Sequence, residues 1–287
     1  MSKVKVLAAS VNDKGQKIAS VEVEYGRIVH GEVMTHRSFG RNGASSRAIP
    51  TKAMRGILTF SPEKWGSNKS GMQAGEELSG LRLVFAKFGW EFGRTTAKMS
   101  SWIMSKAGLH KQWANRPTEP YQWMKLVITA TDWDNFFNLR CSDLAQPEIE
   151  SLAEGVYAAL SNVDYVHLKE GEWHTPYYKD GYWKPTVGGS NVDKYGYTLD
   201  EALKISASCT AQTSYRRSDD SLEKAERVFD RLMNDDPKHA SPTEHQATPI
   251  TDNMINSGNL AEHGITHITT KGDYYSANLK GWVQYRH

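Results

Sequence analysis

Cysteine and long apolar runs are what this sequence most clearly lacks. Only 2 of its 287 residues are cysteine, Cys141 and Cys209, too few for a disulfide framework or a four-thiolate metal site. A membrane-spanning helix needs about 20 consecutive apolar residues, and no run in the sequence approaches that length. Residues 1–5 also lack the apolar core of a secretory signal. We therefore expect a cytoplasmic protein without a membrane partner.

An excess of one charge is also missing. Lys and Arg number 35 and Asp and Glu number 33, which gives a formal net charge of +2. That balance argues against binding nucleic acid through bulk charge, so we expect no nucleic-acid partner. The aromatic content is high, with 9 Trp and 13 Tyr, residues that suit clefts with one dry and one wet side.

Local patterns predict a chain of mixed strands and helices. Apolar residues that alternate with Glu22 and Glu24 predict a strand over 18–25, preceded by another over 3–9. The sequence predicts helices over residues 27–35, 75–107, 148–160, 199–206 and 221–234, the last with Ser221 as its N-cap. Residues 125–141 are expected to begin as a strand or helix and continue as helix. Glycine-rich residues 38–47 predict a loop, 161–198 irregular surface structure or a lid, and 264–287 a hairpin or strand.

The loop over 38–47 has the composition of an anion-binding site. A guanidinium group binds phosphate with a planar fork, and hydroxyl and backbone N–H groups complete such a site. The candidates are His36, Arg37, Asn42, Ser45, Ser46 and Arg47. The alternative is an ordinary solvated loop.

Two further clusters have a functional and an ordinary interpretation. The run from His110 through Lys111 and Gln112 to Arg116 could hold a phosphate, although an exposed helix end is the favoured explanation. Asn135, Asn138 and Arg140 interrupt an apolar helix, where polar groups need buried partners. A ligand or a nearby acidic side chain would supply those partners.

Metal binding and cysteine chemistry are the weaker candidates. His239, Glu244 and His245 resemble a partial metal site without a further ligand cluster, so we expect no metal. Ser241 followed by Pro242 and Glu244 also fits a helix N-cap. Cys141 has no neighbouring base, which favours a buried structural thiol. No phosphate-loop or dinucleotide-binding glycine pattern is present.

Taken together, these motifs resemble the flavin-dependent thymidylate synthases, the ThyX family. The family signature Arg-His-Arg, seven residues, Ser is matched by Thr35-His36-Arg37 and Ser45. The segment from Asn135 to Ile149 resembles a second signature, and the pattern over 110–116 resembles a phage and bacterial branch. The resemblance covers about residues 19–160.

Two further segments match the family out of order. Residues 208–214 and 239–245 resemble segments that stand near the N-terminus in the family. Our hypothesis is that the chain is circularly permuted. Residues 1–160 would then form the core with the flavin and nucleotide motifs. Residues 161–198 would be an aromatic-rich insert or lid, and 199–287 would complete the same fold.

The resemblance implies an α+β fold with a mixed sheet, and a homotetramer with active sites shared between subunits. It implies FAD as cofactor, dUMP as substrate, methylenetetrahydrofolate as carbon donor and NADPH as electron donor. The positions that match the family's FAD site are His36, Arg37, Asn42, Asn135, Ser241 and His239. Those that match its nucleotide site are Ser45, Ser46, Arg47, Lys111, Gln112, Arg116 and Arg140. The family role of Arg140 is catalytic: it favours the N3 anion of the pyrimidine and activates C5, which leaves Cys141 a bystander.

Several positions depart from the family pattern and leave the substrate open. Thr35 replaces an Arg and Gly43 a Glu, Gly40 stands in place of Ser, and Thr129 and Thr131 replace flavin contacts. Glu32 stands in place of a nucleotide-binding Gln, for which Gln284 could substitute. One alternative is methylation or hydroxymethylation of dUMP or dCMP for a modified phage genome, in the host cytoplasm. Another is a flavin- or nucleotide-binding protein without turnover.

Overall fold

A five-stranded sheet organises the fold, in the order β3-β4-β2-β1-β5. Its strands are β1 (Lys3–Val11), β2 (Lys17–Gly26), β3 (Gly40–Gly43), β4 (Trp123–Ala130) and β5 (Val166–His167). The computed structural model describes residues 1–186 and 191–287. Strand β2 pairs antiparallel with both β1 and β4, whereas β5 joins β1 in parallel. The fold is mixed α+β.

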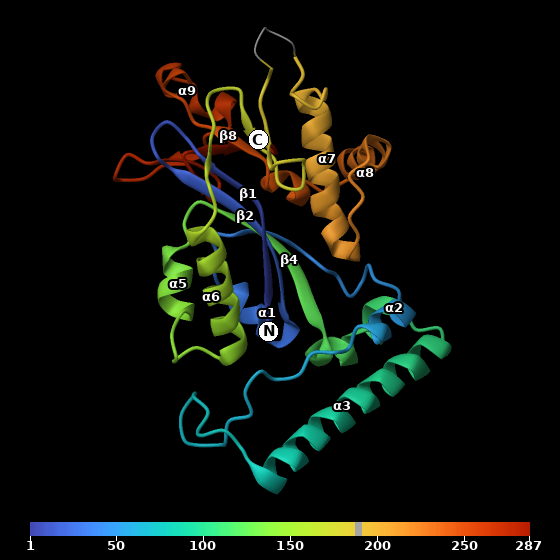
Figure 1. Cartoon of the computed structure of the whole chain (residues 1–287). Coiled ribbons are helices and arrows are strands. Elements are labelled where there is room, and N and C mark those ends of the chain that lie inside the picture. Colours follow the sequence, from blue (N-terminus) through green and yellow to red (C-terminus); the bar gives the residue numbers. More distant parts are fainter. Residues whose placement is uncertain (187–190) are drawn as a thin grey trace.

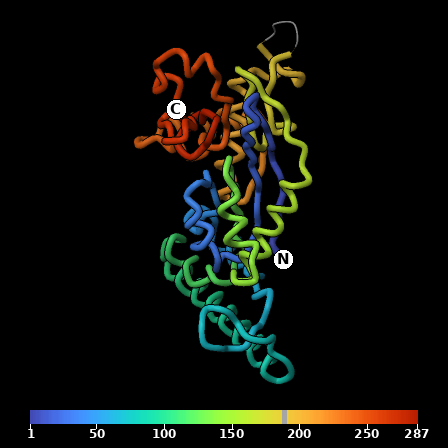
Figure 2. The backbone as a smooth tube through the Cα atoms, turned by 90° about the vertical axis from the view of Figure 1, so that its left-hand side faces the viewer, coloured from blue at the N-terminus to red at the C-terminus, as the bar shows by residue number. Residues whose placement is uncertain are grey.

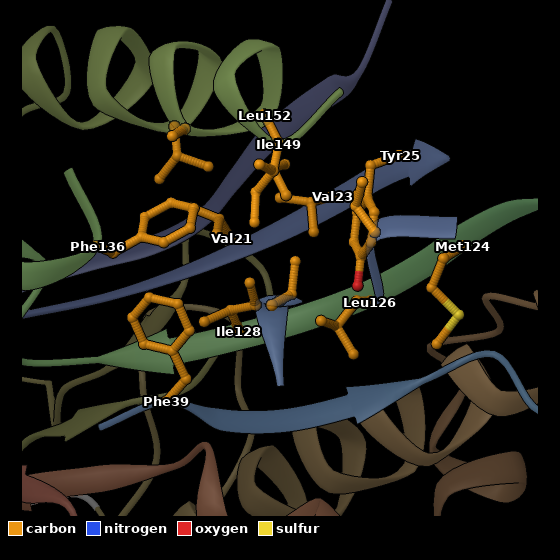
Figure 3. Close-up of a cluster of buried hydrophobic side chains, with 14 of the residues drawn as sticks. Val21, Val23, Tyr25, Phe39, Met124, Leu126, Ile128, Phe136, Ile149 and Leu152 are labelled. Atoms are coloured by element: carbon orange, nitrogen blue, oxygen red, sulfur yellow. The ribbon is translucent and has the colours of Figure 1, made fainter. Parts of the chain in front are cut away.

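The main core lies between this sheet and two helices, α5 (Asp134–Arg140) and α6 (Pro147–Ser161). Val21 and Val23 on β2 meet Phe136 on α5 and Ile149 and Leu152 on α6 (Figure 3). The alternation along β2 places these valines in the core and leaves Glu22 and Glu24 partly exposed. Burying each such apolar side chain stabilises the fold by about 1.5–3 kcal/mol.

The strands between residues 173 and 287 build two smaller sheets, and two longer helices lie in the same part of the chain (Figure 1). A four-stranded sheet has the order β12-β8-β6-β7, and a three-stranded sheet has the order β11-β10-β9. Helix α7 begins with a capping box in which Thr198 and Glu201 satisfy each other's backbone N–H groups. The strands are β6 (Trp173–His174), β7 (Tyr182–Trp183), β8 (Ala247–Pro249), β9 (His267–Ile268), β10 (Tyr274–Ser276), β11 (Leu279–Lys280) and β12 (Trp282–Gln284). The helices are α7 (Leu199–Gln212), α8 (Leu222–Asn234) and α9 (Asp252–Asn256).

A buried chain of hydrogen bonds joins the C-terminal part to the main sheet. The Ser10 and Ser20 hydroxyls each lie 2.9 Å from a ring nitrogen of His174. Ser20 also contacts the Thr129 hydroxyl, which lies 2.8 Å from His245 Nδ1. Because all five side chains are buried, this network fixes residues 174 and 245 against β1, β2 and β4.

The longest helix, α3 (Gly80–Lys106), lies at the end of the molecule away from the C-terminal part (Figure 2). It contacts α2 (Thr51–Gly56), α4 (Lys111–Ala114) and the 3₁₀ helix η2 (Arg116–Tyr121). The remaining short elements are α1 (His30–Val33), η1 (Arg27–Val29), η3 (Thr213–Tyr215), η4 (Ser241–Glu244) and η5 (Leu260–His263). In the part of the chain that is described, no helix combines the length and apolar character needed to cross a bilayer.

Most elements predicted from the sequence are confirmed. The expected strands over 3–9 and 18–25 and the helices over 75–107, 148–160 and 221–234 correspond to β1, β2, α3, α6 and α8. The predicted loop over 38–47 is wrong in part, because residues 40–43 pair with β4 as the edge strand β3. Ser221 holds the N-cap position of α8, but its hydroxyl donates to the Asp219 carboxylate instead of capping the helix.

Residues 161–198 are buried in part, whereas the sequence predicted irregular surface structure or a lid for them. They contribute β5, β6 and β7, and Tyr178 and Trp183 belong to a buried cluster with α7. Residues 187–190 lie outside the described part of the chain. A role for this segment as an insert or lid stays a prediction.

Candidate functional site

A cavity of about 600 Å³ lies where the N-terminal and C-terminal parts of the chain meet. Asn42, Ser45 and Arg47 approach it from β3 and the following loop, and His110 from the start of α4. The C-terminal part supplies the rest of the wall from α7, η3, α8 and the segment before η4. These residues include Gln212, Ser214, Tyr215, Arg217, Lys224, Val228, Arg231, Leu232, His239 and Ser241.

Hydrogen bonds to backbone carbonyl groups hold the loop after β3 in place. Asn115 Nδ2 donates to the carbonyl groups of Ser46 and Ile49 at 2.8 and 3.0 Å. Lys111 Nζ donates to the Ala48 carbonyl at 3.0 Å. The side chains of Lys111 and Asn115 therefore support the loop after β3 by bonding to its backbone carbonyl groups.

The same loop is joined to the C-terminal part by two direct bonds. Asn42 Nδ2 donates to the Thr210 carbonyl at 2.8 Å, and the Ser45 N–H donates to the Ser214 carbonyl at 3.1 Å. Arg216 anchors the neighbouring turn, with an ion pair of 2.8 Å to Glu24 and a hydrogen bond to the Trp123 carbonyl. The two walls of the cavity are thus fixed relative to each other.

The cavity wall is cationic. Arg47, Arg217, Lys224 and Arg231 all line it, and no Asp or Glu is among its described lining residues. Within residues 1–186 and 191–287 none of these four cations has an ion-pair partner, whereas their neighbour Arg227 pairs with Glu223. Cationic side chains that have no carboxylate partner and that lie beside hydroxyl groups favour an anionic ligand, and phosphate in particular.

The sequence analysis missed three of these cations, Arg217, Lys224 and Arg231. Lys224, Val228 and Arg231 are spaced by four and three residues, so they share one face of α8. That spacing could have identified Lys224 and Arg231 as neighbours from the sequence. The position of Arg217 could not be predicted from the sequence. It depends on the turn at Arg216, whose backbone is left-handed with φ of 55°.

A second cluster lies around Arg140. Arg140 Nε donates to His36 Nε2 at 3.2 Å, and its Nη1 lies 3.4 Å from Glu32 Oε2. His36 is 4% exposed, with ring centroids 4.9 Å from Phe136 and 5.6 Å from Phe39. Burial lowers the pKa of His36, and the charges of Arg140 and Arg41 lower it further. The ring is therefore neutral near pH 7, with Nε2 as the acceptor.

A third cluster surrounds Glu119. Its carboxylate accepts from the Ser46 hydroxyl at 2.6 Å, from Arg116 at 2.8 Å and from Arg27 at 3.0 Å. Ser46 and Arg116 also line a smaller cavity of about 210 Å³ together with Arg27 and Arg41. Ser45 lines both cavities, so the loop after β3 separates them.

The structure does not bring all the predicted site residues to the larger cavity. Asn42, Ser45, Arg47, His239 and Ser241 line it. Arg37 and Asn135 are exposed elsewhere, on the turn after α1 and on α5. Gln284 is buried in β12, where its Nε2 donates to Asn278 at 2.9 Å. Gln112 is half-buried in α4, and its backbone N–H donates to His110 Nδ1. Their binding roles stay predictions.

Two expectations about buried groups are wrong. Asn135 and Asn138 lie on the exposed face of α5, because Phe136 on that helix points into the core, and Arg140 alone of the three has the acidic partner. Cys141 is exposed, and Cys209 is the buried cysteine. Among the described residues, no group of three or more His, Cys, Asp or Glu side chains is arranged to hold a metal ion.

Comparisons with known proteins add little to these residues. No protein-family model and no curated protein matches the sequence. Solved structures to which this chain is similar include the UMP/dUMP methylase PolB from Streptomyces cacaoi, bound with 5-Br dUMP and with 5-Br UMP. The TM-score is 0.45 for both, at 12% and 13% identity, covering 56% of this chain and 90% and 89% of theirs.

Proposed function

We propose that this chain is a flavin-dependent enzyme that methylates C5 of dUMP. Methylenetetrahydrofolate would supply the carbon and NADPH the electrons. One observation carries the proposal. The two segments that resemble the family out of order, 208–214 and 239–245, lie beside the loop that carries the first signature. Asn42 bonds to Thr210, Ser45 bonds to Ser214, and Ser241 lines the same cavity as both Asn42 and Ser45. A circular permutation of the family fold would produce this arrangement.

The residues of the larger cavity fit FAD. Its volume falls within the 300–1,000 Å³ of small-molecule sites. Arg217, Lys224 and Arg231 have no ion-pair partner in the described part of the chain and would hold the diphosphate, and the hydroxyl of Ser241 would complete its hydrogen bonds. Bound flavin would supply the redox chemistry.

Arg140 would act on the pyrimidine. A guanidinium at short range stabilises an anion, and most strongly in a site that excludes water. Its side chain is 21% exposed and is oriented by His36 and Glu32. Because His36 accepts a hydrogen bond from Arg140 and stays neutral, it fixes the guanidinium without competing for a negative charge. The base would bind as its N3 anion, with the N3 proton released to solvent, and this charge would activate C5 without a cysteine nucleophile.

The active site would be shared between subunits of a homotetramer. The described lining residues of the larger cavity do not include Arg140, so one chain does not present Arg140 to a ligand held there. A second subunit could bring its Arg140 cluster to the first subunit's cavity. This sharing is the arrangement that the family resemblance implies.

A specific observation also favours dCMP as an alternative substrate. Glu32 lies 3.4 Å from Arg140, at a position where the family pattern has an uncharged Gln. A carboxylate accepts a hydrogen bond from the 4-amino group of cytosine, whereas it repels the 4-oxygen of uracil. The product could then be a methylated or hydroxymethylated cytosine nucleotide.

The first test is the visible absorbance spectrum of the purified protein, recorded before and after addition of dUMP and of dCMP. Flavin bands that shift with one nucleotide would support the proposal and select the substrate. Product mass after incubation with methylenetetrahydrofolate and NADPH would separate methyl from hydroxymethyl transfer. A colourless protein that takes up no added FAD would refute the flavin proposal. Bound flavin and nucleotide without product under any donor would instead favour a non-catalytic binding protein.

A further inference from the structure

One face of α3 carries large apolar side chains that are exposed. Leu81, Phe85, Phe88 and Phe92 are 64–75% exposed, and Met99 and Trp102 are 57% and 50% exposed. The helix lies along the outer edge of the molecule (Figure 1). At 27 residues it is about 40 Å long, so these side chains form an extended apolar strip.

The opposite face of α3 is fixed to the rest of the chain. Trp90 Nε1 and Arg94 Nη2 both donate to the Phe60 carbonyl, at 3.2 and 2.6 Å. Ser101 is fully buried, and a Cβ on Gly93 would lie 2.4 Å from the Tyr121 hydroxyl. Packing of this opposite face against the rest of the chain therefore keeps the exposed strip turned towards solvent.

The spacing of the strip is that of a helix that packs against another helix. Residues 81, 85, 88, 92, 95, 99 and 102 alternate in steps of four and three, which are the a and d positions of a heptad repeat. Thr95 is the polar member of this set, and its hydroxyl donates to the Glu91 carbonyl within the helix. An irregular peptide partner would not require this periodicity.

We propose that α3 pairs with α3 of a second copy of this chain, antiparallel, about a two-fold axis at the level of Gly93 and Arg94. In this register Phe85 faces Trp102 of the second copy, and Phe88 faces its Met99. The two-fold axis repeats each contact, so Phe85, Phe88 and Trp102 gain apolar partners, and Phe92 faces Thr95 of the second copy. The inference rests on α3 alone and not on the proposed activity.

The residues that flank the strip support this register independently. Glu91 faces Lys98 of the second copy, and the symmetry makes this opposite-charge contact twice. Gly89 faces Thr96 of the second copy. A Cβ at Gly89 would meet nothing within 4 Å, so this flank of α3 is open to a side chain of the second copy.

The first test measures the mass of the full chain by analytical ultracentrifugation. The native protein should sediment as a multiple of 32.3 kDa, and F88E should halve the mass of that assembly. Leu144 is 69% exposed on another surface, so L144E introduces the same charge at a similar site and should leave the mass unchanged. A native protein that stays at the mass of one chain, or equal masses for native and F88E, would overturn the pairing. So would native protein that is monomeric in solution but binds lipid vesicles through α3.

Two further variants test the register. E91K and K98E should each weaken association by repulsion, and the double variant E91K/K98E should restore it. Gly89 and Thr96 of the second copy lie at nearly the same level on one flank of the strip, so the double variant G89C/T96C should form a covalent dimer on mild oxidation, with the exposed Cys141 changed to Ser. M99C in the same background should not, because Met99 meets Phe88 and not itself. Cross-linking of M99C and not G89C/T96C would show a parallel pair and refute the register.

Discussion

Asn42 on β3 donates a hydrogen bond of 2.8 Å to the carbonyl of Thr210 on α7, across 168 positions of the sequence. This bond places the side chain of a short edge strand at the wall that the C-terminal helices build. Ser45 repeats the connection to Ser214 at 3.1 Å. The cationic cavity therefore depends on both parts of the chain, and neither part would form it alone.

Arg231→Ala should weaken FAD binding at least about tenfold. A hydrogen bond to a charged group contributes roughly 1.5–3 kcal/mol, and Arg231 lines the cavity without an ion-pair partner in the described part of the chain. Arg227→Ala is the matched control, because Arg227 lies on the same helix and pairs with Glu223 outside the cavity. Titration of apoprotein with FAD, followed by quenching of flavin fluorescence, measures both. Equal affinities for the two variants would contradict the assignment of the cavity.

Arg140→Ala should abolish turnover, by about 100-fold or more, while the protein stays folded and keeps its flavin bands. Arg140 lies outside the lining of the cavity assigned to FAD, so cofactor uptake should be little changed. Turnover of dUMP, followed by product mass, measures the loss, and Arg227→Ala should retain activity. Activity like that of the native protein in the Arg140 variant would remove its proposed role at N3.

Cys141→Ala should remain active. Partial desolvation raises the pKa of the Cys141 thiol, and the charges of Glu154 and Glu150 raise it further, so the group is a thiol and not a nucleophilic thiolate at neutral pH. The same product assay tests this, with circular dichroism to verify folding. A folded but inactive variant would revive a covalent mechanism that uses this cysteine.

The sequence predicted local elements well and long-range placement unevenly. The alternation along 18–25 and the apolar spacing of 148–160 depend on near neighbours, and β2 and α6 follow them closely. Strand β3 could not be read from residues 40–43, because it exists through pairing with β4, more than eighty positions away. Glycine-rich composition describes a loop equally well.

For the candidate site, the sequence predicted residues where polar and charged side chains occur together with glycine in one short segment. The loop of Asn42, Ser45 and Arg47 was found this way, and it lines the larger cavity. Lys224 and Arg231 could not be assigned to the site from the apolar face of α8, because both are charged residues that line the cavity beside Val228 and Leu232. The position of Gln284 could not be predicted, since a strand only three residues long buries it behind Asn278.

Acidification from about pH 6.5 to about pH 5 should reduce the free energy of unfolding. Burial lowers the pKa of His174 to about 3, with a further contribution from His245, and burial lowers the pKa of His245 to about 3 as well. In the unfolded chain both rings titrate near 6.5, so the unfolded state binds more protons throughout this interval. The stability that these neutral rings contribute is fully present above pH 6.5 and is lost progressively as the pH falls towards 3.

Each ring should account for about 1.4 kcal/mol per pH unit well below 6.5, so the pair gives a slope of roughly 3 kcal/mol per unit. Urea unfolding followed by tryptophan fluorescence measures this slope, and the pH stays high enough that most carboxylates remain ionised. NMR of the imidazole rings should show His174 and His245 still neutral at pH 5 in the folded protein. An unfolding free energy that is level across this interval would mean that water reaches the network of Ser10, Ser20 and Thr129, and that the two rings titrate in the folded state.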